Sequence, residues 1–431
     1  MNQGDRFYIR AYGCQMNLYE AGLVREILGR RGFAETSEES EADLVLLLTC
    51  SVREHAEQRA IGRLQNLRGL KRSRPEMILA VLGCMAQGRG AELANGLGAD
   101  LVVGPDEYRR LPELIEAYRT SGERQIATRL GGECYEGLLP QNRSPITGMV
   151  TVMRGCDNYC AYCIVPYVRG HERSKSWEAV LAEAVALVRG GCRDITLVGQ
   201  NVLAYRDGDL DFAGLLRLAD RLDGGPWIRF LTSHPKDVTR EFALALSELE
   251  NLCPHVHLPM QSGSDRILHV MNRKYTSAEY RQKVAWLRAA LPGLSLTTDV
   301  LVGFPGESDQ DFEQTLELVR EVGFDFAYMF RYSERPGTTA CRMDGKVPES
   351  VAAARLSRLI AVQNDITRER NQALVGTRLE VLVEARRDPD LLARTRTNKI
   401  VVLKTDAPIG ARIRAAITGI KGWTPIAESC E

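Results

Sequence analysis

The chain has no net charge, few histidines and no long apolar run. Its 56 Lys and Arg residues balance 56 Asp and Glu residues, so any contact with nucleic acid must come from a local basic patch. The six histidines show no spacing typical of a metal site. No stretch is apolar enough to cross a bilayer, and the N-terminus lacks the basic and apolar regions of a secretion signal. We therefore expect a cytoplasmic protein without a membrane partner, and several domains, because 431 residues exceed one hydrophobic core.

Cysteine is the most informative residue that is present. The chain has eleven cysteines, which in a reducing compartment are more plausible as ligands or buried thiols than as disulfides. Three of them form the pattern Cys156-x3-Cys160-x2-Cys163, directly after the apolar stretch Met149–Met153. This spacing lets one short loop hold a 4Fe-4S cluster by three thiolates and leaves one iron open. A zinc knot is the alternative, but it needs a fourth ligand, and only His171 follows nearby.

The cysteine triplet resembles the signature of the radical S-adenosylmethionine (SAM) superfamily. In that superfamily the amino and carboxylate groups of SAM occupy the open iron, and the cluster supplies the electron that splits SAM. The resemblance implies radical chemistry at an unactivated carbon. It also implies that Tyr162, beside the third cysteine, lies near the adenine of SAM.

Three other cysteines each follow a strand-like stretch in the first part of the chain. Strand-like and helix-like stretches alternate there, which predicts a parallel sheet covered on both faces. The strands are expected at Arg6–Tyr12, Asp43–Thr49, Met77–Gly83 and Asp100–Val103, and the first three lead to Cys14, Cys50 and Cys84. Because the carboxyl ends of parallel strands line one crevice, we expect the three thiols to converge on a second cluster site. The alternative is that each is a small buried hydrophobe.

The remaining cysteines show no such phasing, and we expect them to be structural: Cys134, Cys192, Cys253, Cys341 and Cys430. A looser stretch over 120–145 separates the first part of the chain from the triplet. From Gly148 on, six βα units recur, which predicts a partial (βα)6 barrel with its chemistry at the carboxyl ends of the strands. The strands are expected at Met149–Met153, Ile195–Val198, Trp227–Leu231, Val256–Leu258, Leu294–Val302 and Phe326–Phe330.

Polar residues and a glycine turn mark the carboxyl ends of these predicted strands. We expect them to bind the ribose and methionine parts of SAM, although each polar side chain could instead satisfy a loop backbone. The candidates are Gln200, Ser233, Gln261, Asp299 and Gly303. After a long helical stretch, roughly Pro348–Leu374, the tail is rich in strand-like segments and carries more basic than acidic residues.

The tail predicts a small basic β-barrel related to the OB fold. Between two of its strands, the segment 394–399 stands where loops of such barrels contact single-stranded nucleic acid. The candidate RNA-binding residues are Arg394, Arg396, Asn398 and Lys399. A solvated hairpin explains the same charges nearly as well.

Four motifs together resemble the methylthiotransferase family of radical SAM enzymes. They are Tyr12-Gly13-Cys14-Gln15-Met16-Asn17, the segment 51–59, the segment 155–170 around the cysteine triplet, and the segment 258–264. The opening motif most resembles the members that convert N6-(dimethylallyl)adenosine at position 37 of tRNA to its 2-methylthio derivative. Small departures occur at Glu20 and Ala21, where many relatives carry Asp-Ser, and at His55, where Asn is common.

The resemblance implies an α/β multidomain fold. Its parts are an N-terminal parallel α/β sheet domain (1–125), a central radical SAM (βα)6 partial TIM barrel (145–365) and a C-terminal TRAM β-barrel (368–431) that grips tRNA. It implies an auxiliary 4Fe-4S cluster on Cys14, Cys50 and Cys84, a SAM cluster on Cys156, Cys160 and Cys163, and the use of two SAM molecules. A monomer served by an electron donor such as flavodoxin or ferredoxin is expected.

Three other functions compete with this interpretation. Within the family, the substrate could be N6-threonylcarbamoyladenosine in tRNA or an aspartate of a ribosomal protein, although Gln15-Met16-Asn17 argues against both. From a different class, the chain could be a non-catalytic RNA-binding protein whose cysteines hold zinc.

Overall fold

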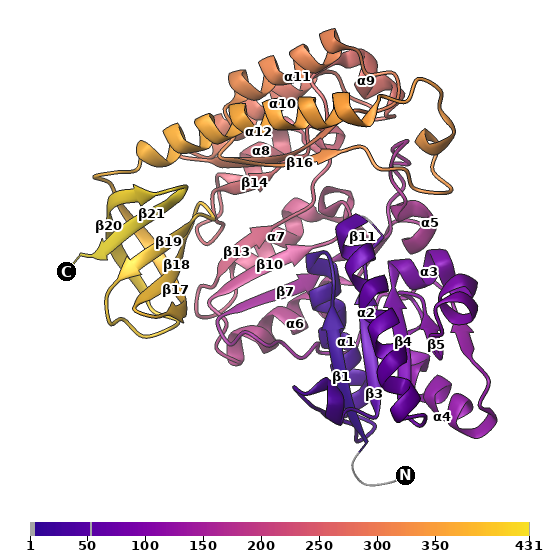
Figure 1. The fold of residues 1–431 in the computed structure, drawn as a ribbon. Coiled ribbons are helices and arrows are strands. Elements are labelled where there is room, and N and C mark those ends of the chain that lie inside the picture. The colour runs from indigo at the N-terminus through magenta and orange to yellow at the C-terminus, as the bar shows by residue number, and fades with distance from the viewer. Residues whose placement is uncertain (1–4, 52–53, 431) are drawn as a thin grey trace. The chain divides into compact units, whose positions relative to one another are not determined.

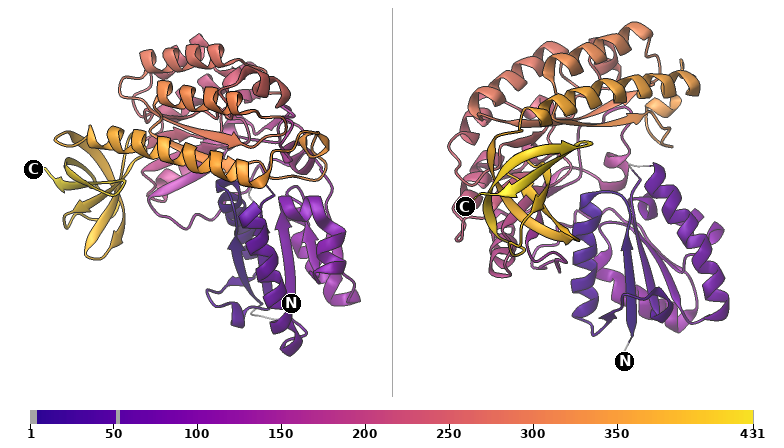
Figure 2. Two further views of the ribbon diagram at one scale, coloured as in Figure 1. Left: turned by 45° about the horizontal axis from the view of Figure 1, so that its top comes forward. Right: turned by 60° about the vertical axis from the view of Figure 1, so that its left-hand side comes forward.

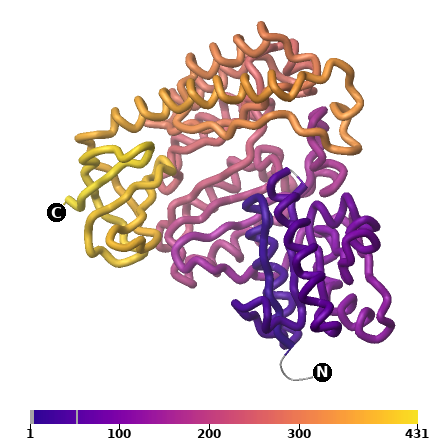
Figure 3. The backbone as a smooth tube through the Cα atoms, in the orientation of Figure 1, coloured from indigo at the N-terminus to yellow at the C-terminus, as the bar shows by residue number. Residues whose placement is uncertain are grey.

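The computed structural model describes residues 5–51 and 54–430. The N-terminal residues 1–4, Val52 and Arg53 of the second motif, and Glu431 lie outside the described residues. The chain divides into two compact units. Unit 1 comprises Met1–Arg143, Thr151–Tyr159 and Cys163–Glu183, and unit 2 comprises Ser144–Val150, Cys160–Tyr162 and Ala184–Glu431. Figure 1 shows their elements by label and Figure 3 traces the backbone.

Unit 1 is built on a parallel sheet of order β2-β1-β3-β4-β5-β6. Its strands are β1 (Arg6–Ala11), β2 (Ala34–Glu35), β3 (Leu44–Thr49), β4 (Ile78–Gly83), β5 (Leu101–Val103) and β6 (Gln125–Ala127). The longer helices are α1 (Gln15–Gly29), α2 (Glu54–Ser73), α3 (Cys84–Ala91) and α4 (Leu111–Ser121). Every residue of β3 and β4 is buried, as expected for central strands with both faces covered. The predicted parallel α/β sheet is confirmed.

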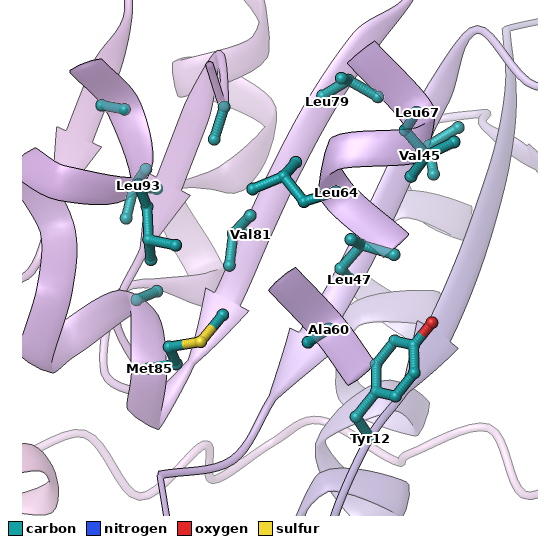
Figure 4. Close-up of a cluster of buried hydrophobic side chains, with 14 of the residues drawn as sticks. Tyr12, Val45, Leu47, Ala60, Leu64, Leu67, Leu79, Val81, Met85 and Leu93 are labelled. Carbon is teal, nitrogen blue, oxygen red and sulfur yellow. The ribbon is translucent and has the colours of Figure 1, made fainter. Parts of the chain in front are cut away.

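A hydrophobic cluster holds α2 on this sheet. Ala60 and Leu64 on α2 pack with Val45, Leu47 and Val81 from β3 and β4, as Figure 4 shows. Each of these side chains is at most 1% exposed. Because the cluster fixes the strands beneath α2, it also fixes the loops that follow their carboxyl ends.

Unit 1 also contains the short segments around the cysteine triplet. They are β8 (Met153–Arg154), α5 (Val165–Arg169), β9 (Arg173–Ser174) and the beginning of α6 (Trp177–Arg189). The strand predicted over Met149–Met153 is therefore interrupted. β7 ends at Thr151, and β8 pairs antiparallel with β9 instead of continuing the barrel strand.

Unit 2 holds six parallel barrel strands in two three-stranded sheets, ordered β13-β10-β7 and β14-β15-β16. An isolated parallel bridge links Ile228 of β13 with Leu252, which precedes β14. The strands are β7 (Thr147–Thr151), β10 (Asp194–Val198), β13 (Trp227–Phe230), β14 (His255–His257), β15 (Ser295–Val302) and β16 (Phe326–Arg331). This arrangement confirms the predicted (βα)6 partial barrel.

Helices and one hairpin connect these strands, and a last helix, α12 (Glu349–Gln372), leads from β16 to the C-terminal barrel. The hairpin is β11 (Arg206–Asp207) with β12 (Leu210–Asp211), and the connecting helices are α7 (Phe212–Asp220), α8 (Arg240–Leu246), α9 (Asp265–Val270), α10 (Ser277–Ala290) and α11 (Asp309–Val322). Side-chain caps explain where several helices begin. Thr276 and Glu279 form a capping box on α10, and Ser308 and Asp311 form one on α11.

The C-terminal strands close into a barrel of order β17-β18-β19-β21-β20, seen from two sides in Figure 2. They are β17 (Arg378–Arg387), β18 (Asp390–Thr395), β19 (Ile400–Lys404), β20 (Arg412–Lys421) and β21 (Thr424–Ser429). The small β-barrel expected from the tail is confirmed. The predicted basic loop is shorter than expected, because Arg394 and Thr395 belong to β18.

Among the described residues, no helix combines the length and apolar character that crossing a bilayer requires.

Candidate functional site

The strand-end cysteines lie along one edge of the unit 1 sheet. Cys14 precedes α1 just after β1, Cys50 directly follows β3, and Cys84 is the first residue of α3 after β4. β1, β3 and β4 are neighbours in the sheet. The chain turns outward from β1 to the edge strand β2 before it returns to β3, so Cys14 and Cys50 flank the point where strand order reverses. Ligand sites of open α/β sheets form at such points.

The three thiols interact. A hydrogen bond with the Cys50 thiol lowers the pKa of Cys14 to about 6, against the effect of burial and with help from Arg169. Burial raises the pKa of Cys84, Arg169 opposes that rise, and Cys14 also acts on it electrostatically. Cys14 thus favours the thiolate form that iron binds. The structure therefore places the three thiols close to one another.

Gly13 makes this arrangement possible. Its φ is +110°, and a Cβ at this position would lie 2.3 Å from Cβ and 3.1 Å from Sγ of Cys50. A residue with a side chain would be strained in this conformation and would displace Cys50. Glycine is therefore required beside the cysteines by both backbone conformation and space.

A buried arginine contacts the third thiol. Arg169, at the end of α5, donates from Nε to Sγ of Cys84 over 3.1 Å. Its other nitrogens donate to the two carboxylate oxygens of Glu20 over 2.6 and 3.1 Å. Arg169 is 3% exposed and Glu20 is fully buried. The departure from the family pattern at Glu20 thus falls on a residue that holds the partner of Cys84.

Among the described residues, no group of three His, Cys, Asp or Glu side chains is arranged to hold a single metal ion. A cubane cluster separates its thiolate ligands more widely than one ion does. Three converging cysteines, one of them with a lowered pKa, are the donor set that a 4Fe-4S cluster takes. The residues present therefore fit such a cluster in unit 1.

The cysteine triplet is divided between the units: Cys156 and Cys163 lie in unit 1, and Cys160 lies in unit 2. In unit 1, Asn158 donates to Sγ of Cys156 over 3.3 Å. Gly155 has φ +77°, and a Cβ there would lie 1.9 Å from the carbonyl oxygen of His171. The glycine before the first cysteine thus allows the loop to pass close to the backbone at His171.

In unit 2, Arg273 contacts two residues of the same loop. Its guanidinium lies 3.4 Å from Sγ of Cys160 and 3.5 Å from the hydroxyl of Tyr162, and it donates to the carbonyl of Pro259 over 2.9 Å. Arg273 is 4% exposed. Arg273 therefore ties Cys160 and Tyr162 to the backbone at Pro259, which fixes the geometry of the predicted ligand loop.

Three of the six predicted SAM-binding residues lie together around β14 and β15. The hydroxyl of Ser233 donates a hydrogen bond to the carbonyl oxygen of His257. His257 lies 3.5 Å from a carboxylate oxygen of Asp299, and the backbone N–H of Gln261 donates to the carbonyl of Asp299 over 2.8 Å. Ser233, Gln261 and Asp299 thus form one polar group in the barrel.

The other three occupy separate places in unit 2. Tyr162 contacts Arg273, and Gln200 follows the carboxyl end of β10. Gly303, just after β15, has φ +73°, and a Cβ there would lie 2.7 Å from Cβ of Ala352 on α12. The packing of α12 therefore gives a structural reason for this glycine. SAM binding by these six residues stays a prediction.

Strained backbone marks the same region. Thr232, Gln261, Asn272 and Lys274 have φ between +57° and +69°, although none is glycine. They flank or include Ser233, Gln261 and Arg273. Such conformations cost energy and persist where the surrounding structure holds them, which is common in binding sites. This signal cannot be read from spacing in the sequence.

The four predicted RNA-binding side chains contact other parts of unit 2. Arg394 pairs with Glu384 and donates to Asn398 over 3.0 Å. Arg396 donates to the carbonyls of Glu250 and Leu252, and Lys399 contacts Asp325 and Asn371 over 2.7 and 2.9 Å. Each side chain therefore has a role within the protein, and RNA binding by this set stays a prediction.

Comparison with known proteins identifies the family. Residues 6–104 match the Uncharacterized protein family UPF0004, and residues 150–319 match the Radical SAM superfamily. A protein of Moorella thermoacetica is 43% identical over 97% of this chain and 96% of its own length, and one of Chlorobium limicola is 44% identical over 99% and 98%. A third, from Desulfosudis oleivorans, is 46% identical over 88% and 83%. All three are named tRNA-2-methylthio-N(6)-dimethylallyladenosine synthase.

The chain belongs to this synthase family. A solved structure with the same fold is the radical SAM methyltransferase TsrM of Kitasatospora setae with cobalamin and a [4Fe-4S] cluster bound. It has a TM-score of 0.61 and 14% identity over 79% of this chain and 77% of TsrM. At that identity the likeness concerns the fold alone. Membership of the synthase family implies SAM and iron–sulfur cofactors, in agreement with the prediction.

Sequence reasoning missed the two arginines that touch cysteine thiols. Arg169 stands inside the motif around the triplet, yet no spacing indicates that its side chain reaches Cys84, far away in the sequence. Arg273 stands outside every motif that carried the family resemblance. The available signal was weak: Arg169 precedes Gly170, and Arg273 follows Asn272.

Proposed function

We propose that this chain methylthiolates C2 of N6-(dimethylallyl)adenosine at position 37 of tRNA, using SAM and two 4Fe-4S clusters. The observation that carries the proposal is the convergence of Cys14, Cys50 and Cys84 at one sheet edge, in a chain that also carries the radical SAM triplet. A radical SAM enzyme needs only one such triplet to cleave SAM. A second three-cysteine site is what a sulfur-inserting member requires.

The six cysteines would hold the two clusters. Cys14, Cys50 and Cys84 would ligate the auxiliary cluster, and Cys156, Cys160 and Cys163 the SAM cluster. When bound, the clusters and SAM supply electron transfer and radical chemistry that side chains cannot provide. The chain's own task is to hold these groups and to exclude competing reactions.

The polar group of unit 2 would orient SAM. Asp299, with His257 3.5 Å away, offers a carboxylate to ribose hydroxyls or to the amino group, and Ser233 and Gln261 stand beside it. Arg273 fixes Cys160 and Tyr162 relative to Pro259, so the ligand loop and the aromatic ring keep one geometry. Tyr162, Gln200 and Gly303 complete the proposed SAM site.

The partners follow from the reaction. The proposed domains are the methylthiotransferase domain at 1–125, the radical SAM domain at 145–365 and the TRAM domain at 368–431. The TRAM domain, which is the C-terminal barrel, would bind the anticodon arm of tRNA. An electron donor such as flavodoxin or ferredoxin would reduce the clusters. We place the enzyme in the cytoplasm, as a monomer, with its tRNA substrate.

A reaction with defined substrates tests the proposal. Anaerobically reconstituted protein is incubated with SAM, reductant and tRNA bearing either dimethylallyladenosine or threonylcarbamoyladenosine, and separately with the ribosomal protein, before mass spectrometry. We expect product only from the dimethylallyl tRNA. Product only from another substrate would replace this assignment. Iron analysis should give about eight irons per chain for two clusters, whereas zinc without iron would favour the RNA-binding alternative.

Cysteine variants separate the tasks of the two clusters. Cys14→Ala should retain reductive cleavage of SAM and lose methylthiolation, because only the auxiliary cluster loses a ligand. Cys160→Ala should release no deoxyadenosine at all. Equal loss of both reactions in Cys14→Ala would contradict separate tasks, and chromatography of deoxyadenosine beside modified nucleosides measures both.

A further inference from the structure

Arg169 is the centre of a buried charge network in unit 1. Its two terminal nitrogens donate to the carboxylate of Glu20, and its Nε donates to Sγ of Cys84 over 3.1 Å. The hydroxyl of Tyr108 also donates to Glu20. Glu20 therefore holds Arg169 in a fixed position against the thiol.

The network carries an excess of positive charge. Arg154 lies 3.0 Å from Glu20 and 3.7 Å from Asp106, and Arg173 lies 2.5 Å from Asp106. Three guanidinium groups thus share two carboxylates. Nε and one terminal nitrogen of Arg154 are buried without a hydrogen-bond partner. The adjacent pair Lys175–Glu183 is balanced and does not supply the missing negative charge.

A buried cation in excess favours a nearby anion, because little water is present to screen it. The nearest candidate on the far side of Arg169 is the sulfur of Cys84. A Cys84 thiolate that ligates an iron–sulfur cluster would supply this negative charge, together with the charge of the cluster itself. Hydrogen bonds to ligand sulfurs and local charge are also the levers by which proteins set cluster potentials.

We propose that Arg169 is a positioning residue that holds the Cys84 thiolate for the auxiliary cluster and raises the reduction potential of that cluster, while Glu20 limits the rise. This inference rests on the proposed function for the presence of the auxiliary cluster. One-electron reduction adds a negative charge to the cluster, and a fixed positive charge beside a ligand sulfur stabilises that state. The charge of Glu20 opposes the same stabilisation.

Two substitutions should therefore shift the potential in opposite directions. Arg169→Gln removes the positive charge and should move the midpoint potential to more negative values. Glu20→Gln removes the negative charge but keeps an amide oxygen of the same reach that accepts from Arg169, and it should move the potential to more positive values. Arg169→Lys keeps the charge and should lie closest to the parent among Arg169 variants. A purely structural role for Arg169 predicts no such opposition.

The test uses full-length protein with Cys156→Ala, Cys160→Ala and Cys163→Ala, so that only the auxiliary cluster can bind. Each further variant is reconstituted anaerobically, analysed for iron, and titrated with dithionite while the reduced cluster is followed by electron paramagnetic resonance. Arg25→Gln is the matched control. It breaks a partly buried pair with Glu35 in the same unit, in which the two charged groups lie 3.0 Å apart, and it should leave the potential unchanged.

Each outcome decides the proposal. It is overturned if Arg169→Gln leaves the potential unchanged, or if Arg169→Gln and Glu20→Gln shift it in the same direction. If Arg169→Gln binds no cluster, Glu20→Gln carries the test: a positive shift supports the proposal, and no shift or a negative one overturns it. If the protein with only the three Cys→Ala changes binds no iron, the auxiliary cluster is absent. That result would overturn the proposed function itself, not only the role of Arg169.

Discussion

At the scale of single residues, the glycine beside the first cysteine is the most sensitive position of the proposed cluster site. Gly13→Ala places a methyl group only 2.3 Å from Cβ of Cys50, and it forces alanine to φ +110°. We expect Cys50 to be displaced and the auxiliary cluster to be lost. Iron per reconstituted chain should fall by about half, while the SAM cluster still forms.

A matched control separates displacement from backbone strain. Gly32 has φ +85° in the same unit, and a Cβ there would meet no atom within 4 Å. Gly32→Ala should cost about 1 kcal/mol of stability without changing the iron content. Full iron in Gly13→Ala would show that Cys50 does not need its present position.

The placement of the candidate ligands could be predicted where it depends on their spacing in the sequence. The positions of Cys14, Cys50 and Cys84 after three neighbouring strands follow from strand periodicity and the rules of parallel sheets. The contacts of Arg169 and Arg273 do not, because each joins segments far apart in the sequence. Such contacts depend on side-chain packing, which no local pattern encodes.

At the scale of elements, the start of α11 depends on one carboxylate. Burial works against the charge of Asp311, but hydrogen bonds from Arg266, Ser264 and Ser308 hold its pKa well below the ordinary value. Asp311→Asn should lower the free energy of unfolding by about 2 kcal/mol at neutral pH. Because the pKa of the folded state is depressed, this contribution is complete above the ordinary Asp pKa of about 3.9 and is lost as the pH falls below it.

Urea denaturation between pH 7 and pH 3 measures this effect. The stability difference between the parent and Asp311→Asn should narrow on acidification. Asp309→Asn is the control: it lies in the same first turn of α11, and its pair with Arg355 is screened by solvent because its side chain is 93% exposed. A difference that is constant with pH would mean that the charge of Asp311 contributes nothing.

The sequence predicts which segments form helices and strands better than it predicts where those elements begin and end. Buried apolar runs identified β1, β3, β4 and the six barrel strands. The break between β7 and β8 was missed, because the apolar run continues through Val152 while the chain leaves the barrel sheet to pair with β9. The short edge strand β2 was missed as well, since two exposed residues carry no periodic signal.

At the scale of the molecule, Arg229 is one of the residues that hold the C-terminal barrel in unit 2. Its guanidinium pairs with Asp194 and donates to the carbonyls of Thr395 and Arg396 over 3.0 and 2.8 Å. Arg229→Met should cost about 3 kcal/mol, because Asp194 is left buried without its partner. We expect faster proteolysis between α12 and β17. Arg217→Met, in an exposed pair with Glu248, should not change the cleavage rate.

The same interactions distinguish two ways in which the barrel could bind tRNA. Arg386 and Arg387, on β17, are exposed, whereas Arg396 donates to backbone carbonyls of unit 2. If the exposed pair binds phosphates, Arg386→Ala with Arg387→Ala should weaken tRNA binding and lower the slope of its salt dependence by about 1 for each phosphate that is no longer bound. Arg396→Ala should leave that slope unchanged. Filter binding across a salt series would favour the loop instead if only Arg396→Ala reduced the slope.

The small size of α5 has a consequence for biogenesis. This helix of five residues begins shortly after Cys163 and ends at Arg169, whose side chain touches Cys84. So short a rigid span transmits any displacement of one thiol loop to the other. We therefore expect that loading one proposed centre changes the rate at which the other is loaded, while each centre still fills on its own.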